Sequence, residues 1–205
     1  MEVLELKPIE NKKIVVYVSS KENARYFQNV DHSKLVEFLK RNNIDFVTVD
    51  FQVDMKEFSK TTFALALNEL KIPYFQVDIP DYAMGYLYQE IIEKQEFQNE
   101  LFEEYEMMEN KESYKGQSLK NWIDMLGEEI QEKEIFLSLK LRPQWIVKKM
   151  LDIACSFKKD TIFFVHFVQE DICEDICLQI VENLREIGVK VISYNKKHTI
   201  QKIIL

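Results

Sequence analysis

The chain has 205 residues, which is enough for one domain of ordinary size with a substantial core. Its 46% hydrophobic and 30% charged residues are typical of a folded soluble protein and exclude a fully disordered one. Acidic residues outnumber basic ones by 35 to 27, and the net charge of −8 disfavours nonspecific binding to nucleic acid or to anionic membranes.

The cysteine count and the N-terminal sequence indicate an intracellular protein. Three cysteines cannot all pair, and the opening segment MEVLELKPIENKK lacks the apolar core of a secretory signal. No apolar run approaches the roughly 18 to 20 residues that a membrane-spanning helix needs. We therefore expect a cytoplasmic protein with reduced thiols and no membrane insertion.

The first 80 residues alternate short apolar runs with helix-length segments. Strands are expected at 13–19, 44–51 and 74–79, with helices at about 31–41 and 61–70. Asp31 can cap the first helix, and Asn42 and Asn43 can end it. Short strands separated by such helices predict a parallel sheet with right-handed crossovers.

Residues 81–140 are predicted to form a helical insertion. The segment 89–112 carries nine glutamates against two lysines, which favours a long exposed helix. A polar stretch at 110–118 predicts a mobile loop, and Ser118 could cap a second helix from Leu119 to about Lys140. The apolar residues that could pack the first of these helices are Ile91, Ile92, Phe97, Leu101 and Phe102.

The last third returns to alternating helices and strands. Arg142 and Pro143 predict a break before a helix that ends near Phe157, because proline suits a first helical turn. A strand at 161–168, a helix ended by Gly188 and a strand at 189–194 follow. We expect one α/β domain over 1–205: a mostly parallel sheet of about five strands, helices on both faces, and the insertion between the third and fourth strands.

Polar residues follow the predicted strands, where open parallel sheets bind their ligands. They are Ser19, Ser20, Asp50, Asp54, Asp78, Asp81, Gln169, Glu170 and Asp171. Asp50, Asp78 and Glu170 could together hold Mg²⁺ or Mn²⁺, because hard cations prefer oxygen ligands. The alternative is that the aspartates only cap helices and turns. None of the four glycines lies between the first strand and the first helix, which disfavours a phosphate-binding loop.

His166 and the cysteines have a structural and a functional interpretation. His166 alternates with apolar residues in its strand, so a core histidine is favoured over a ligand or a base. Cys173 and Cys177 share the apolar face of a predicted helix, and core packing is expected for both and for Cys155. Trp122, Trp145, Tyr82, Tyr86 and Tyr88 could line a groove, but their helical spacing favours the core.

Four segments, taken in order, resemble the TraB/PrgY family, α/β proteins that include proposed metal-dependent peptidases and pheromone-shutdown proteins. VVYVSS and IDFVTVDF are similar to the first two strands of the family. ALALNELKIPYFQVDIP resembles its helix and following strand, and LRPQWIVKKMLDIA with TIFFVHFVQED resembles its late helix and strand. Together they span most of the chain.

The resemblance implies roles for three residues. Asp50 would match a glutamate at the end of the second strand of the family, and Asp78 would match the acidic residue of the turn that ends its third strand. Arg142 would match the arginine of its late helix. The two Gly-x-x-His signatures of the family would fall near 19–21 and 166–169, and neither is present. The resemblance therefore favours a divergent, noncatalytic relative.

Three hypotheses follow. The first is a noncatalytic module whose acidic insertion docks a protein partner or a second copy of the chain. The second is a hydrolase in which a divalent cation at Asp50 and Asp78 activates water, with Glu170, His166 or Arg142 as further candidates. The third is a small-molecule sensor that binds at the same sheet edge.

Overall fold

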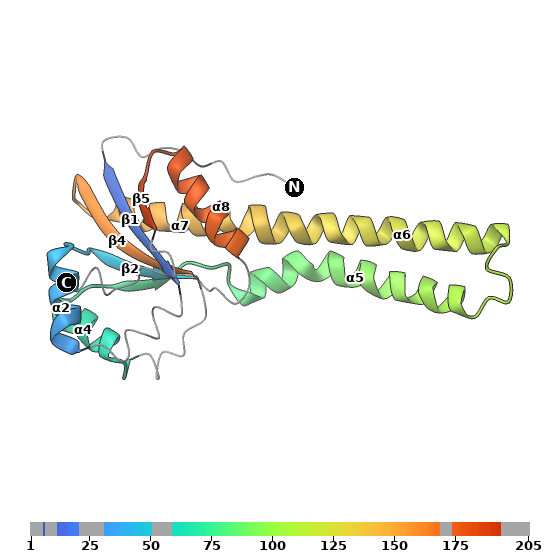
Figure 1. Ribbon diagram of the computed structural model, residues 1–205, viewed down its shortest axis with the longest axis horizontal. Coiled ribbons are helices and arrows are strands. Elements are labelled where there is room, and N and C mark those ends of the chain that lie inside the picture. The colour runs from blue at the N-terminus through green and yellow to red at the C-terminus, as the bar shows by residue number, and fades with distance from the viewer. Residues whose placement is uncertain (1–5, 7–11, 21–30, 51–58, 169–173, 194–205) are drawn as a thin grey trace. The chain divides into compact units, whose positions relative to one another are not determined.

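The computed structural model describes residues 6, 12–20, 31–50, 59–168 and 174–193 (Figure 1). The chain divides into two compact units, which we call the α/β unit (1–78 and 143–205) and the helical unit (79–142). The α/β unit contains β1 (Lys13–Ser20), α2 (His32–Arg41), β2 (Phe46–Val49), α4 (Thr62–Leu70), β3 (Tyr74–Gln76), α7 (Arg142–Ser156, which starts at the boundary), β4 (Thr161–Val168), α8 (Glu174–Glu186) and β5 (Lys190–Ser193).

The five strands form one sheet in the order β3-β2-β4-β1-β5. Every pairing is parallel, and β4 lies between β1 and β2 in the middle of the sheet. The predicted α/β class and five-stranded parallel sheet are confirmed. Since all strands run the same way, their carboxyl ends meet at one edge.

One face of the sheet packs against α2 and α4. Val15, Val47 and Val165 come from three neighbouring strands and belong to the same buried cluster as Leu35 of α2 and Leu67 of α4. These strand positions alternate with the residues that face the other side. Their side chains form a buried core between the sheet and these two helices.

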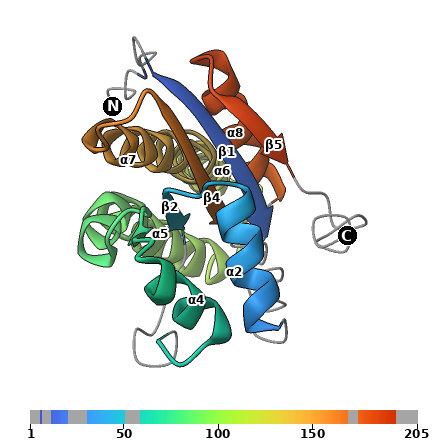
Figure 2. The ribbon, with the colours of Figure 1, turned by 90° about the vertical axis from the view of Figure 1, so that its left-hand side faces the viewer.

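The other face is covered by α7. The ring of Phe46 in β2 stacks on Phe164 of β4 and on Phe157, directly after α7, with centroid distances of 4.4 and 5.2 Å. From β1 through β2 to β3 the chain moves toward one side edge of the sheet, and from β3 through β4 to β5 it moves toward the other. Because connections between parallel strands are right-handed, the connections of the first series lie on one face and those of the second series on the opposite face. Figure 2 shows α7 across the strands from α2 and α4, which confirms helices on both faces.

Local signals determine several helix ends. Asp31 caps α2 by accepting from the backbone N–H of Ser33 at 2.8 Å, and Asn42 ends that helix, both as predicted. Gly188 adopts a φ of 80°, a left-handed conformation that suits glycine at a helix end. The ends of these elements therefore follow from short-range chemistry.

The helical unit contains α5 (Asp81–Glu106), α6 (Tyr114–Ile135) and the π-helix η2 (Phe136–Leu141). α5 and α6 form an antiparallel hairpin (Figure 1). The expected start of α6 at Leu119 is wrong by five residues: Ser113, not Ser118, caps the helix and accepts from Gly116 N at 3.2 Å. Gly116 permits the tight turn before this earlier start, because a Cβ there would lie only 2.2 Å from Lys111 O.

The predicted helix with Pro143 in its first turn is confirmed as α7, but the predicted break before it is absent. Arg142 has helical dihedral angles (φ −61°, ψ −49°), and α7 begins there directly after η2. Proline removes one helical hydrogen bond and crowds the carbonyl four residues earlier. The π-helix η2 contains the residue four positions before Pro143, where the hydrogen bond is missing and the carbonyl is crowded. Its wider turn accommodates both effects, so the chain stays helical at Pro143.

Candidate functional site

Three of the predicted site residues lie at the carboxyl ends of β1 and β2, at one edge of the sheet. Ser19 and Ser20 end β1 and pair with the last residues of β4, Phe167 and Val168. Asp50 directly follows β2, and its backbone N–H donates to Phe167 O at 3.3 Å. The chain reverses its direction across the sheet between these strands, which is where open α/β sheets bind ligands.

The remaining candidates are divided. Asp78 lies two residues beyond β3, and its neighbour Val77 continues the pairing by donating to Val49 O at 2.9 Å. Asp81 and Arg142 belong to the helical unit, and Arg142 is buried. Asp54, Gln169, Glu170 and Asp171 lie outside the described residues. The structure therefore brings Ser19, Ser20, Asp50 and Asp78 to the ends of three strands of one sheet.

His166 lies on β4, opposite Thr48 of β2. It is fully buried, as predicted, and its Nδ1 lies 3.0 Å from Thr48 Oγ1. Burial lowers its pKa from 6.5 to about 3, while the contact with Thr48 acts in the opposite direction, so the ring is neutral near pH 7. Within the described part of the chain, Nε2 has no hydrogen-bond partner.

His166 and Asp50 lie on the same face of the sheet, near the carboxyl ends of β4 and β2. Asp50 comes two residues after Thr48, so the alternation of β2 places both positions on the face that carries His166. The Asp50 carboxyl group is also buried, with 1% of the residue exposed. A neutral imidazole and a buried carboxyl at a sheet edge can bind a polar ligand.

A metal site at this edge stays a prediction. Among the residues that the structure describes, no group of three histidine, cysteine, aspartate or glutamate side chains is arranged to hold a metal ion. Glu170, the third predicted ligand, is outside that set.

The cysteines do not form a site among the described residues. Cys155 is exposed, so its predicted place in the core is wrong. The buried stripe of α7 passes through Met150 and Ala154, and the next residue turns away from it. Cys177 is half-buried beside the buried Ile176, and Cys173 lies outside the described residues.

α5 and α6 meet along a seam with coiled-coil spacing. The seam residues follow one another at alternating intervals of three and four, which is the spacing of a heptad seam. They are Met84, Leu87, Ile91, Lys94, Gln98, Leu101 and Tyr105 on α5, and Gly116, Leu119, Ile123, Leu126, Ile130 and Lys133 on α6; all are buried or half-buried.

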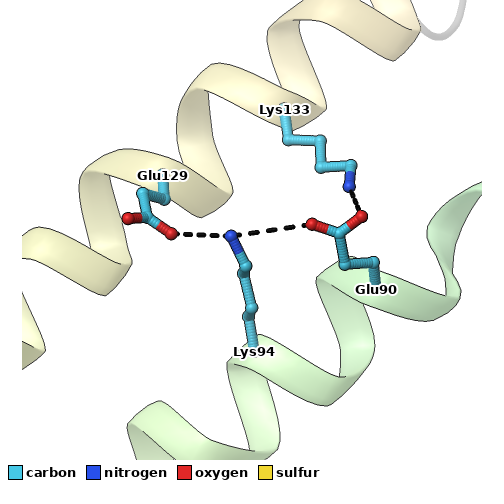
Figure 3. A network of polar contacts seen from close by, with 4 residues as sticks. All are labelled: Glu90, Lys94, Glu129 and Lys133. Atoms are coloured by element: carbon cyan, nitrogen blue, oxygen red, sulfur yellow. Dashed lines mark hydrogen bonds and ion pairs between the residues drawn. The ribbon is translucent and has the colours of Figure 1, made fainter. Parts of the chain in front are cut away.

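Polar side chains interrupt this seam and join its two helices (Figure 3). Lys94 Nζ lies 2.6 Å from Glu129 Oε2 and 3.6 Å from Glu90 Oε1, and Lys133 forms an ion pair with Glu90. The hydrogen bond from Lys133 lowers the pKa of Glu90, and that to Glu129 raises the pKa of Lys94. Polar residues at seam positions commonly fix the register of paired helices.

Large apolar side chains remain on the outside of the hairpin. Trp122 is 53% exposed, Met125 46% and Phe97 41%. Tyr82 and Tyr86 are more exposed still, so the core interpretation of Trp122 and these tyrosines is wrong. Tyr88 and Trp145 are half-buried. Of the five apolar residues predicted to pack α5, Ile92, Phe97 and Phe102 are exposed, because only Ile91 and Leu101 are at seam positions.

The charge of the protein is concentrated in the helical unit. Residues 79–142 contain 15 acidic and seven basic residues, a net charge of −8. The whole chain has 35 and 27, so the α/β unit has 20 of each and no net charge. The acidic character of the protein is therefore a property of the hairpin unit alone.

Sequence reasoning missed one buried carboxylate. Asp45 accepts from the backbone N–H of Phe163 at 2.9 Å and forms an ion pair with Lys159. These contacts join β2 to β4 at the amino edge of the sheet, away from the candidate ligand site. The only sequence signal was an acidic residue near the start of the strand predicted at 44–51.

Comparisons with protein-family models, with curated proteins and with solved structures found no match to this chain. The TraB/PrgY relationship therefore stays a prediction from the four segments. No helix among the described residues combines the length and the apolar character needed to cross a membrane.

Proposed function

We propose that this protein is a noncatalytic binding module that docks a protein partner through the α5–α6 hairpin. The observation that carries the proposal is the coincidence of two properties on one unit. The hairpin unit has all of the net charge, and it exposes most of the large apolar side chains that lie on the described surface.

The hairpin buries few side chains for its length. Its fully buried apolar cluster consists of Ile91, Ile130 and Leu137, with partly buried neighbours around them. Helices of 26 and 22 residues that are joined by such a thin core leave most of their surface available. Clusters of exposed aromatic and methionine side chains commonly mark interaction sites.

A photo-crosslinking experiment tests this proposal. A benzophenone amino acid replaces Met125 on α6 in the full chain, within cells that naturally make the protein, and replaces the exposed Glu37 on α2 as a matched control. We expect a discrete adduct from position 125 that is absent from position 37 and is lost when Trp122 is changed to serine. The absence of an adduct at 125, or the same adducts at both positions, would contradict the proposal.

A second candidate function is ligand binding at the carboxyl edge of the sheet. It is favoured by His166, whose buried Nε2 has no hydrogen-bond partner among the residues that the structure describes, while its Nδ1 contacts Thr48. The buried Asp50 follows on the same face of β2. A divalent-metal hydrolase using Asp50 and Asp78 is the catalytic version of this candidate. A distant relationship to the TraB/PrgY family would place its ligand at the same edge.

A further inference from the structure

One side of the hairpin combines the exposed apolar residues with acidic ones. On α5, three residues directly precede seam positions: Glu90 precedes Ile91, Phe97 precedes Gln98, and Glu104 precedes Tyr105. In an antiparallel pair of helices, the residues that precede equivalent seam positions on the two helices flank the same side of the seam.

The ion pairs identify that side on both helices. Lys115 Nζ, which precedes the seam residue Gly116, lies 2.6 Å from Glu104 Oε1 across the hairpin. Trp122 and Glu129 precede the seam residues Ile123 and Ile130, so they belong to the same row of α6 as Lys115. Phe97 and Trp122 therefore flank the same side of the seam.

The register brings these two aromatic residues to the same level. Gln98 Nε2 donates to Ile123 O at 2.8 Å, and each aromatic residue comes one position before one of these partners. Met125 follows Trp122 by three residues and shares its helix face. We call Phe97, Trp122 and Met125 the aromatic face of the hairpin.

Glutamates border the aromatic face. Glu93 and Glu100 lie four residues before and three residues after Phe97, and Glu129 lies four residues after Met125. All three are exposed. An apolar centre with an acidic border is complementary to a helix that has apolar residues on one side and lysine or arginine beside them.

We propose that the partner segment is a basic amphipathic helix that lies along the aromatic face; this inference rests on the proposed docking function. A second copy of the chain fits less well, because a two-fold contact would set the same glutamates against one another and bring two units of charge −8 together. Tryptophan, phenylalanine and methionine suit such a contact, because they supply large or adaptable apolar area.

Two synthetic peptides serve as probes for the full chain. Both have the same leucine and tryptophan residues on one helical side, and the other side carries lysine and arginine in one peptide and glutamate in the other. Isothermal titration calorimetry should detect the basic peptide with at least about tenfold higher affinity than the acidic one. Equal affinities, or no binding of the basic peptide, would overturn the inference.

Matched substitutions locate the contact. Phe97→Ser should weaken the basic peptide at least about tenfold, whereas Phe102→Ser should change its affinity less than about twofold. Phe102 is the control because it is a phenylalanine on the same helix, 52% exposed, that follows a seam position and so lies on the other side. If the two variants change the affinity equally, whether both weaken the peptide or neither does, the peptide does not contact the aromatic face specifically, and the inference is refuted.

The border is tested separately. Glu93→Gln combined with Glu100→Gln should weaken the basic peptide about fivefold and reduce the dependence of binding on salt. Sedimentation velocity should show no dimer of the parent chain through the aromatic face. A dimer that Phe97→Ser abolishes would mean that a second copy occupies this face, and would overturn the choice of a basic helix. If the peptides fail but the crosslink at position 125 persists, the docking function stands and the partner class is wrong.

Discussion

Protonation of His166 should destabilise the protein in mildly acidic solution. The side chain is fully buried, and its pKa is lowered from 6.5 to about 3. Between these two pH values the unfolded chain binds one more proton at this position than the folded chain does. The free energy of unfolding must therefore fall as the pH falls through this range, and it should be insensitive to this group above about pH 7.

The expected size of the effect follows from the shift. Each pH unit between the two values costs about 1.4 kcal/mol, so lowering the pH from about 7 to about 5 should remove about 2 kcal/mol. This is a large part of the stability of an ordinary domain.

Urea unfolding of three proteins isolates this contribution. The parent chain is compared with His166→Asn, which keeps a polar atom toward Thr48 but cannot titrate, and with His32→Asn. His32 is the matched control because it is 41% exposed and lies 3.3 Å from Glu69 on the surface. Each protein is unfolded at pH values of about 7, 6 and 5.

The difference between pH values is the informative quantity. His166→Asn should be less stable than the parent near neutral pH, because a buried side chain is shortened, yet it should lose about 2 kcal/mol less on acidification. His32→Asn shows how far the loss of a surface histidine alone changes this difference. If the parent and His166→Asn lose the same free energy to within about 0.3 kcal/mol, the reasoning about the buried ring is refuted.

Three further predictions concern separate parts of the chain. Asp45→Asn should lower the free energy of unfolding by about 1 to 2 kcal/mol, because the buried carboxylate loses its charge toward Phe163 N and Lys159. Lys159→Gln should lower it by less than about 1 kcal/mol, because that lysine is exposed. Equal losses for the two variants in urea unfolding would contradict this prediction. Gly116→Ala should lower the melting temperature of the chain, because its Cβ would meet Lys111 O. Gly85→Ala places its Cβ in open space and should raise the free energy of unfolding by up to about 1 kcal/mol. If Gly116→Ala were the more stable of the two variants, the turn would not be tightly packed. For the metal-dependent candidate, Mn²⁺ or Mg²⁺ should raise the melting temperature, and Asp50→Asn with Asp78→Asn should abolish the rise; a parent chain that does not respond to either ion would exclude this candidate.

Much of the α/β unit could be predicted because its signals are local. A β-branched apolar run such as 13–19 suits a strand wherever it lies, and Asp31 caps α2 through its own neighbours. Ser113 and Ser118 show the limit of such signals, since both can cap a helix. Gly116 permits the earlier start, because a side chain there would collide with Lys111 O, and that close approach exists only once the chain has turned.

The candidate sites were predictable as lists of residues and not as arrangements. The burial of His166 followed from its strand pattern, but its contact with Thr48 joins residues 118 positions apart. On α5, periodicity predicted an apolar stripe containing both Ile91 and Ile92. Adjacent helical residues lie about 100° apart, and the narrow seam between two paired helices takes only one of them. Packing against α6 buried Ile91 and left Ile92 exposed.

The sequence by itself determined which segments form strands and which form helices, though not every end of them, together with the parallel class of the sheet and the acidic character of the segment after the third strand. Those properties depend on side-chain shape, periodicity and charge within short windows. Only the tertiary structure decided the strand order β3-β2-β4-β1-β5, the hydrogen-bonding of His166 and the side of the hairpin that carries Phe97 and Trp122. These depend on pairing between distant segments, whose energy is distributed over many contacts and leaves no signal at any one residue.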